Sequence, residues 1–419
     1  MRVLMLTLWY PNLENPIFGT FIHEQVTALQ RLGVDVRVAQ PVALTPPPLP
    51  IMSEKYKKLG MIPRSEVYKG VRVYHPRYLS LPRHLLFEMA GRWMLKGVKP
   101  MLANVYEKWP FDILHAHTTY PCGWCANRLR DKYLPKIKVV HTIHRVSVID
   151  VPTYNSRCKR RVQESLESSD WNVFVSKEGL RLALLYTQGR IRNKMSYITN
   201  GVNVSQFTLS PRESDEVQKL KRKYSDSINI LFIGYLIERK GVKELLRGFD
   251  MLPKLGVRAK ARLFLVGRNM MGSYVDSFVR RHQLSDRVFT VGPVPHDRIK
   301  IWLGFADIFV LPSHSEGLAT VLFEALFMGK CSILTKVGGT CDIVRHMEHA
   351  YLISPGSAHE VATAIATLMG SPSLREKLGR NGRRLIERKY TWQINARRNL
   401  KVYRRLVGNC EKDAKSLGA

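Results

Sequence analysis

Short apolar runs alternate with stretches of helical spacing along the whole chain, and this alternation is the feature that most constrains the fold. In the first half, apolar runs at Val3–Leu8, Val34–Ala39 and Val139–His144 are separated by stretches such as Gly19–Leu32. The strands of a parallel sheet that carries helices on both faces are buried, and they read as continuous apolar runs. The first half therefore predicts a doubly wound α/β domain.

The alternation starts again after a polar, charged segment, Ser210–Ser227, which we interpret as a domain junction. Apolar runs follow at Ile228–Ile233, Arg262–Val266 and Ile308–Leu311. A length of 419 residues also favours two domains. We expect two doubly wound, Rossmann-like domains, residues 1–208 and 209–391, that face a cleft, with the ligands at the carboxyl ends of the strands.

Two segments depart from the regular alternation. Gln40–Pro50 holds five prolines, and we expect an irregular excursion there. Leu81–Trp109 has helical spacing and is expected to be interrupted at Pro100. It mixes large apolar residues with arginines and lysines, so it fits either an amphipathic helix on an acidic membrane or an ordinary packing helix.

The chain is strongly basic, with 66 Lys and Arg against 34 Asp and Glu and a formal net charge of +32. Its hydrophobic content of 45% is too high for a disordered basic protein. The charge predicts an anionic partner: nucleic acid, an acidic membrane or a phosphorylated substrate. The basic residues are spread through both halves and no nucleic-acid-binding signature is present, so we expect no specific nucleic acid partner.

Cellular location is read from the apolar runs and the cysteines. No apolar run reaches the length of about 18 residues that a spanning helix needs, and the apolar start is interpreted as a buried strand rather than a signal peptide. Six cysteines in a chain of this length favour a reducing cytoplasm. Cys122 and Cys125 have C-x-x-C spacing, but a second cysteine pair is missing, so we favour small apolar residues that open a helix over a metal site.

The segment with most chemical content runs from Leu311 to Gly329. A strand end is followed by a polar turn with Glu316, and a helix containing Glu324 begins close behind. Backbone N–H groups at a helix start can bind an anion, and two carboxylates at this offset can bind different hydroxyls of a sugar-containing ligand. The alternative is that one glutamate complements the helix dipole and the other is solvated.

Two further groups carry possible functional residues. The apolar strand that ends at Gly234 is followed by the basic pair Arg239 and Lys240 and then by Gly241, which fits a diphosphate or a solvated basic turn. Four histidines stand at the ends of two neighbouring predicted strands, where they would line a cleft. We expect one or two of them to be functional; they are His115, His117, His141 and His144.

Taken in order along the chain, these motifs resemble the retaining nucleotide-sugar glycosyltransferases of family four, which have the GT-B fold. The strongest anchor is Glu-x7-Glu, Glu316 to Glu324, preceded by Pro312-Ser-x-Ser. Lys240-Gly241 and Val337-Gly-Gly support it. The resemblance runs almost end to end. It implies that the final segment, 392–419, packs back on the first domain.

The resemblance also implies roles for single residues. Glu324 should bind the ribose hydroxyls of the donor nucleotide, and Glu316 should hold its sugar and phosphate. Lys240 should neutralise the leaving diphosphate, and His144 should lie beside the reacting carbon and the acceptor. Gly19 should allow close approach to the β-phosphate. The remaining donor-binding residues are expected to be Thr20, Gly234, Arg239, Gly317, Leu318, Ala319 and Thr320.

The chain departs from the family pattern at three positions. Tyr235 stands where the family usually has an arginine, and Arg239 is expected to supply that charge. Arg145 follows His144 where a small residue is usual, and Asp342 stands where a glutamate is usual. The change at Tyr235 affects the expected contact with the diphosphate, and the change at Arg145 affects the expected acceptor pocket.

We expect a glycosyltransferase that acts with retention, without a cofactor and without a metal ion, since Asp-x-Asp is absent. Its expected partners are a nucleotide-sugar donor and an acceptor glycan or lipid-linked sugar. The expected location is the cytoplasm, either free or at the inner face of an anionic membrane. The alternatives are a sugar-nucleotide epimerase or glycoside phosphorylase on the same fold, or a basic nucleic-acid-binding protein.

Overall fold

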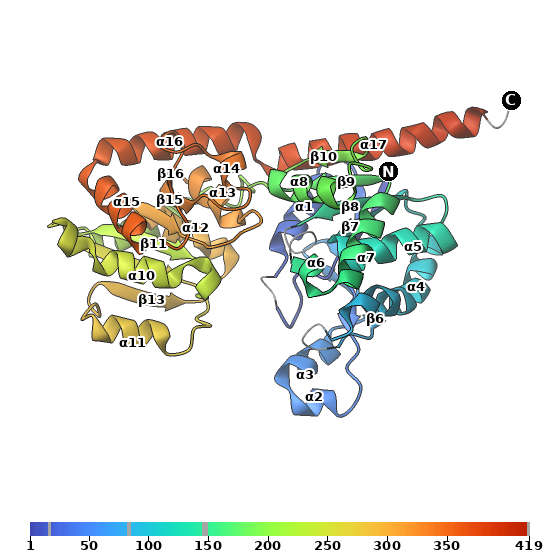
Figure 1. The fold of residues 1–419 in the computed structure, drawn as a ribbon, viewed down its shortest axis with the longest axis horizontal. Coiled ribbons are helices and arrows are strands. Elements are labelled where there is room, and N and C mark those ends of the chain that lie inside the picture. The colour runs from blue at the N-terminus through green and yellow to red at the C-terminus, as the bar shows by residue number, and fades with distance from the viewer. Residues whose placement is uncertain (16–17, 82–84, 145–149, 417–419) are drawn as a thin grey trace. The chain divides into compact units, whose positions relative to one another are not determined.

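The computed structural model describes all residues except 16–17, 82–84, 145–149 and 417–419. The chain divides into two compact units, Met1–Thr199 together with Trp392–Ala419, and Asn200–Thr391. Each unit is built on a sheet of mainly parallel strands with helices on both faces (Figure 1). The expected α/β class with two Rossmann-like domains is confirmed.

The sheet of the first unit has the strand order β10-β9-β8-β7-β1-β2-β5-β4, and all neighbours are parallel except β4 and β5. A separate pair of short parallel strands, β3 and β6, lies outside this sheet. The strands of the first unit are β1 (Arg2–Leu6), β2 (Asp35–Ala39), β3 (Val42–Ala43), β4 (Ser65–Tyr68), β5 (Val71–Tyr74), β6 (Arg77–Tyr78), β7 (Ile113–His117), β8 (Lys138–Ile143), β9 (Trp171–Phe174) and β10 (Met195–Tyr197).

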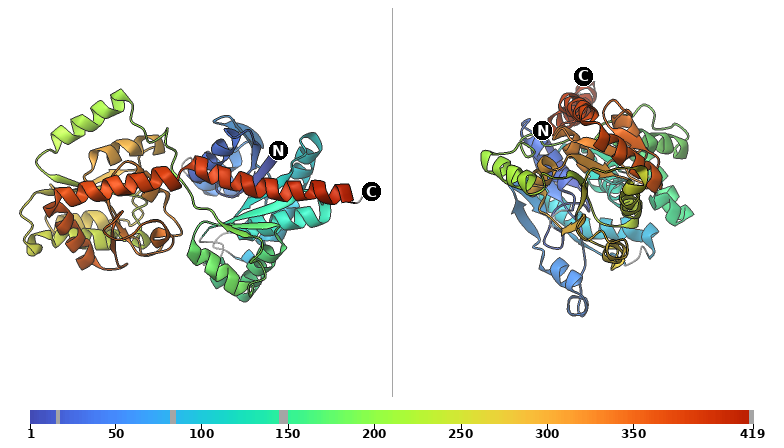
Figure 2. Two further views of the ribbon diagram at one scale, coloured as in Figure 1. Left: turned by 90° about the horizontal axis from the view of Figure 1, so that it is seen from above. Right: turned by 90° about the vertical axis from the view of Figure 1, so that its left-hand side faces the viewer.

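The helices of the first unit cover both faces of its sheet. They are α1 (Thr20–Gln30), α2 (Leu49–Met52), α3 (Glu54–Met61), η2 (Phe87–Met89), α4 (Ala90–Lys108), η3 (Thr119–Gly123), α5 (Trp124–Tyr133), α6 (Val151–Tyr154), α7 (Ser156–Ser168), α8 (Lys177–Tyr186) and α17 (Trp392–Ser416). Strand β1 explains the arrangement, because successive side chains point to opposite faces. Val3 and Met5 pack with α1 and α17, whereas Leu4 and Leu6 pack with α4 and α5. Figure 2 shows α17 lying along this unit.

The second unit has one sheet with the strand order β13-β12-β11-β14-β15-β16, in which every pair is parallel. Its elements are α9 (Pro211–Lys223), β11 (Ile228–Ile233), η5 (Glu238–Lys240), α10 (Val242–Asp250), η6 (Leu252–Leu255), β12 (Ala261–Val266), α11 (Tyr274–Arg281), β13 (Val288–Gly292), η7 (His296–Arg298), α12 (Ile299–Phe305), β14 (Ile308–Leu311), α13 (Thr320–Phe327), β15 (Cys331–Thr335), α14 (Thr340–Ile343), β16 (Tyr351–Ile353), α15 (Ala358–Gly370) and α16 (Pro372–Lys389).

Three expectations about local structure are wrong. The segment Ser210–Ser227, expected to be a domain junction, lies within the second unit and holds helix α9, which begins with a reciprocal capping box of Ser210 and Glu213. Gln40–Pro50 is not wholly irregular, since it contains β3 and the start of α2. Helix α4 continues through Pro100 without a break. The first residues of the expected helix over 81–109 and the end of segment 392–419 include positions outside the described residues.

Helix α4 turns its apolar side toward the core. Met94, Val98 and Leu102 are buried in the cluster beneath the sheet. The interpretation as a packing helix therefore fits α4 better than the interpretation as a membrane-surface helix. Within the described part of the chain, no helix combines the length and the apolar character needed to cross a membrane.

Candidate functional site

The candidate site of the second unit lies where its sheet changes direction of winding. From β11 the chain moves to β12 and β13 on one side, and β14, β15 and β16 then continue on the other side. Strands β11 and β14 are parallel neighbours, so the loops that follow them begin side by side at the carboxyl edge of the sheet. This switch point is where open α/β sheets bind ligands. Lys240 follows β11 and Glu316 follows β14.

Lys240 and Glu316 form a nearly buried ion pair. The Nζ of Lys240 is 2.6 Å from Oε1 of Glu316, and their side chains are 13% and 11% exposed. The hydroxyl of Ser313 donates to the same carboxylate oxygen at 2.9 Å. The carboxylate therefore has a fixed orientation. The ammonium group has three N–H donors, of which this bond uses one.

Arg239 lies beside this pair. Its guanidinium donates to the backbone oxygen of Ser315 at 2.7 Å and stands 3.6 Å from Oε2 of Glu316. The side chain is about half exposed, so it extends from the surface to the buried carboxylate. These two cations and one carboxylate together leave one net positive charge among the three side chains, which suits an anionic ligand.

Glycines allow the two loops to approach closely. Gly241 has φ +71° and begins α10, and a Cβ at this position would lie 2.0 Å from the backbone oxygen of Pro312. A larger residue could not occupy this position without moving the loop after β14. Gly234, at the end of β11, lies beside the side chain of Lys240, and a Cβ at this glycine would lie 3.8 Å from Cε of the lysine. The close approach of the backbone at Gly241 therefore places the turn that carries Lys240 against the turn that carries Glu316.

The start of α13 presents backbone N–H groups at the same edge of the sheet. The half-buried residues Gly317, Leu318 and Ala319 lead into this helix, which begins at Thr320. The backbone N–H of Gly339 donates to the oxygen of Gly317 at 2.8 Å. This bond fixes the turn that precedes α13. The backbone N–H groups at the start of α13 can bind an anion.

Glu324, on α13, is buried rather than solvated. Its side chain is 8% exposed, and its Oε1 accepts a hydrogen bond at 2.8 Å from Nε2 of His296. The alternative of a solvated helix glutamate is therefore wrong for Glu324. Sequence reasoning missed His296. The available signal was its place just beyond the end of β13, at the same edge of the sheet.

The first unit has a switch point of its own, between β1 and β7. Gly19 ends the loop after β1, and Thr20 is the first residue of α1. Gly19 has φ +76°, and a Cβ there would lie 2.3 Å from the carbonyl group of Trp9. This close approach to Trp9 requires a glycine, and the expected approach of Gly19 to a β-phosphate stays a prediction.

His144 lies beside the loop after β1. It is buried, and its ring packs against those of Trp9 and Phe21, each at 5.3 Å between centroids. Its Nε2 is 3.2 Å from Nδ1 of His117. Burial lowers the pKa of His144 to about 4, so the imidazole is neutral at neutral pH. A neutral ring can donate or accept one hydrogen bond to a substrate hydroxyl. Arg145 lies outside the described residues.

The other histidines and the cysteine pair are parts of the core. His115 bonds the hydroxyls of Tyr403 and Thr142. Burial lowers the pKa of His141 to about 3. Cys122 and Cys125 are free and buried, as expected for small apolar residues at the start of a helix. The described residues contain no group of three or more histidine, cysteine or acidic side chains arranged to hold a metal ion.

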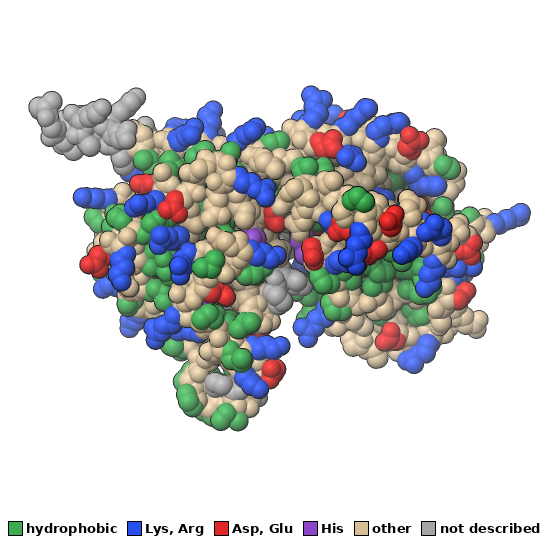
Figure 3. Space-filling view, turned by 180° about the vertical axis from the view of Figure 1, so that it is seen from behind, with side chains coloured by type: hydrophobic (Ala, Val, Ile, Leu, Met, Phe, Trp, Pro, Cys, Tyr) green, Lys and Arg blue, Asp and Glu red, His purple; other side chains and the backbone are tan. Residues whose placement is uncertain are grey.

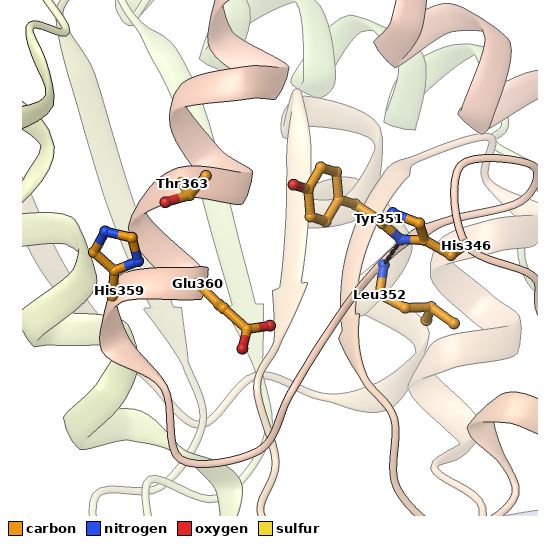
Figure 4. Close-up of a pocket in the computed structure, with 6 residues that line it drawn as sticks. All are labelled: His346, Tyr351, Leu352, His359, Glu360 and Thr363. Atoms are coloured by element: carbon orange, nitrogen blue, oxygen red, sulfur yellow. Dashed lines mark hydrogen bonds between the residues drawn. The ribbon is translucent and has the colours of Figure 1, made fainter.

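A pocket of about 330 Å³ lies elsewhere in the second unit, between β16 and α15 (Figure 4). The residues expected at the functional site take no part in it. Figure 4 shows residues of α15 on one side and Tyr351 with its neighbours on the other. The lining residues are His346, Tyr351, Leu352, His359, Glu360 and Thr363.

Two family models match the chain and together span most of it. The model described as Glycosyltransferase Family 4 matches residues 18–206, and the model described as Glycosyl transferases group 1 matches residues 213–385. The chain belongs to the family 4 type of glycosyltransferase. This assignment favours glycosyl transfer over the epimerase, phosphorylase and nucleic-acid-binding alternatives.

Two relatives of this glycosyltransferase are named for the biosynthesis of teichuronic acid and of capsular polysaccharide. It is 28% identical over 369 residues to the teichuronic acid biosynthesis glycosyltransferase TuaC of Bacillus subtilis, covering 87% of this chain and 88% of that protein. It is 27% identical over 234 residues to the capsular polysaccharide biosynthesis glycosyltransferase CapM of Staphylococcus aureus, covering 53% and 58%.

Solved structures show the same GT-B fold. Sucrose-phosphate synthase from Thermosynechococcus elongatus aligns with a TM-score of 0.76 at 20% identity, covering 98% of this chain and 100% of that chain. HepE from Anabaena, solved in complex with UDP, aligns with a TM-score of 0.72 at 16% identity, covering 96% and 99%. At these identities the likeness concerns the fold alone.

Proposed function

We propose that this glycosyltransferase moves a sugar from a nucleotide-diphosphate sugar to an acceptor hydroxyl with retention of anomeric configuration and without a metal ion. The observation that carries the proposal is the Lys240–Glu316 pair at the switch point of the second unit, with Arg239 beside it. Breaking the sugar–phosphate bond leaves negative charge on the diphosphate. Cations placed in advance stabilise that charge most effectively.

The proposed roles follow from the chemistry of each group. Lys240 and Arg239 stabilise the leaving diphosphate together with the backbone amides at the start of α13, and Glu316 orients the ammonium and the donor sugar. Glu324 binds the ribose hydroxyls. His144, neutral at neutral pH, bonds a hydroxyl near the reacting carbon. Attack from the face of the leaving group, with the phosphate oxygen taking the acceptor proton, retains the configuration without a second carboxylate.

A donor screen by thermal shift tests the proposal. UDP, GDP and ADP, each with and without its sugar, are added to the full chain. A ligand at about 100 times its dissociation constant stabilises the folded protein by about 2.7 kcal/mol. We expect one nucleotide series to raise the melting temperature and to keep doing so in EDTA. Stabilisation by none of the three would contradict the donor class, and dependence on a divalent ion would contradict metal independence.

Product analysis tests the remaining chemistry. With the donor found, release of the nucleoside diphosphate is followed on glycan and lipid-linked acceptors, and the anomeric configuration of the product is read from its NMR coupling constants. The names of these two relatives support a role in polysaccharide biosynthesis, and we propose a glycan or a lipid-linked sugar as the acceptor. An inverted product would overturn retention and leave the donor assignment in place.

We also propose that the enzyme meets its acceptor at the inner face of an anionic membrane through the segment that holds α2 and α3. Ile51 and Met61 are 89% and 65% exposed. Lys55, Lys57 and Lys58 are exposed on α3. Figure 3 shows hydrophobic side chains at the tip of this protrusion, with Lys and Arg beside them. Each lysine near an anionic surface contributes about 1 kcal/mol, and exposed apolar tips enter the interface.

Vesicle co-sedimentation tests this attachment. We expect binding to phosphatidylglycerol vesicles that weakens with salt, weaker binding to phosphatidylcholine vesicles, and a clear loss in the variant Ile51→Glu. The matched control is Leu185→Glu, because Leu185 is 70% exposed on α8. Equal loss in both variants, or binding that ignores salt and lipid charge, would overturn the proposed attachment.

A further inference from the structure

His296 holds one oxygen of the Glu324 carboxylate. The Nε2 of His296 lies 2.8 Å from Oε1 of Glu324. An ionised carboxylate can only accept hydrogen bonds, so Nε2 carries the proton. The His296 side chain is 28% exposed and the Glu324 side chain is 8% exposed, so the bond is largely shielded from water. A bond to a charged group in such surroundings is stronger than the same bond in water.

Gln206 completes a chain of hydrogen bonds behind the histidine. Its side-chain amide lies 3.0 Å from Nδ1 of His296. The ring of Phe207 packs edge-on against the imidazole, with 5.7 Å between the centroids. With the amide N–H directed at Nδ1, the neutral ring keeps its proton on Nε2, facing Glu324. The bond from Gln206 to Nδ1 therefore fixes the tautomer in which Nε2 donates to the Glu324 carboxylate.

We propose that His296 is a positioning residue that fixes the Glu324 carboxylate for the ribose diol of the donor nucleotide. The inference rests on the ribose-binding role proposed for Glu324. Two ionised oxygens offer about four acceptor positions, and His296 uses one of them. The others can receive the two hydroxyls of a ribonucleotide. A carboxylate already held in one orientation loses less freedom on binding, which raises affinity.

The proposal predicts selectivity for ribose hydroxyls that depends on His296. The probes are the ribonucleoside diphosphate identified among UDP, GDP and ADP and its 2′,3′-dideoxy counterpart, with binding measured by calorimetry. We expect the wild type to bind the ribonucleotide about 10- to 100-fold more tightly. His296→Ala weakens ribonucleotide binding about tenfold and leaves dideoxynucleotide binding unchanged. A purely structural defect would weaken both.

Two further variants and a matched control sharpen the test. His296→Gln keeps an N–H donor at a similar reach, and we expect it to restore part of the selectivity. Gln206→Ala releases the tautomer and lowers the selectivity by a smaller factor. The control is His282→Ala, because His282 bonds the carboxylate of Asp250 at 2.8 Å in the same unit, away from the switch-point loops. We expect full selectivity in the control.

The outcomes separate the inference from the proposed function. If the wild type binds both nucleotides equally, the ribose-binding role of Glu324 fails. If the wild type is selective and His296→Ala is equally selective, the role of His296 is overturned and the proposed function stands. Should His296→Ala fail to fold, the other variants decide. The inference is overturned if Glu324→Gln loses the selectivity while His296→Gln and Gln206→Ala both keep it unchanged. Reduced selectivity in Gln206→Ala would support the inference.

Discussion

The ammonium of Lys240 and the carboxylate of Glu316 lie 2.6 Å apart, although one follows β11 and the other follows β14. The parallel pairing of these two strands brings the loops together at the carboxyl edge of the sheet. Each group neutralises the other in surroundings from which water is largely excluded. Replacing one of them therefore has consequences for both the site and its stability.

Removal of the Lys240 charge is expected to slow the chemical step. We predict that Lys240→Ala lowers kcat at saturating donor about 10²- to 10³-fold, because one preplaced donor to the leaving group is lost. Initial rates with the identified donor measure this effect. The matched control is Lys243→Ala, since Lys243 pairs with Glu238 at 2.6 Å in the neighbouring turn. Equal turnover in Lys240→Ala and the wild type would remove the proposed role of Lys240.

Close packing at Gly241 is expected to make this glycine irreplaceable. Gly241 and Gly256 have nearly the same φ, +71° and +73°, but only at Gly241 would a Cβ meet backbone, the oxygen of Pro312 at 2.0 Å. Gly256→Ala introduces only the strain of a positive φ, about 1–2 kcal/mol. We predict that Gly241→Ala destabilises the protein by more than Gly256→Ala and also weakens donor binding. Denaturant midpoints and nucleotide titrations give both numbers, and equal midpoints would contradict the argument.

The stability of the first unit is expected to fall in mild acid. Burial lowers the pKa of His144 to about 4, whereas an unfolded histidine titrates near 6.5. Between these values the unfolded chain binds a proton that the folded chain does not, so the free energy of unfolding rises with pH. The contribution of His144 is thus present above pH 6.5 and lost as the pH falls toward about 4.

The variant His144→Gln isolates this contribution. We predict that the slope of the unfolding free energy against pH, between pH 6 and 5, becomes smaller by up to about 1.4 kcal/mol per pH unit. Denaturant unfolding at several pH values measures the slope. His359→Gln is the control, because His359 is exposed. A slope that does not change in His144→Gln would show that the folded histidine titrates normally.

The parts of the fold that the sequence predicted well are those where local pattern and burial agree. Strands β11 and β14 are buried along almost their whole length, so they read as plain apolar runs. Strand β4 was missed because it is an antiparallel edge strand with exposed and half-buried residues, and only its pairing with β5 makes it a strand. Helix α9 was missed because its polarity resembled a linker, while a single buried residue, Val217, anchors it.

The candidate site divides in the same way. Glu316 and Lys240 were predicted because each stands in a short motif at the end of an apolar strand. The bond between His296 and Glu324 was not predicted, because it joins residues of η7 and α13 that are 28 positions apart in the chain, and the place of His296 just beyond β13 indicated only the edge of the sheet. The Glu-x7-Glu spacing likewise does not predict whether Glu324 is buried or exposed. Such contacts depend on tertiary structure rather than on local pattern.

The C-terminal helix is expected to contribute to the stability of the first unit through one buried hydrogen bond. The hydroxyl of Tyr403, on α17, bonds Nδ1 of His115 on β7, and both side chains are fully buried. Tyr403→Phe keeps the ring but leaves this nitrogen without its partner. We predict a loss of about 1–3 kcal/mol, the cost of an unsatisfied buried polar group. Denaturant midpoints measure it against Tyr133→Phe, a control at a residue that is 42% exposed. If both variants were equally stable, the Tyr403–His115 bond would not hold α17 on the sheet, and apolar contacts alone would account for its packing.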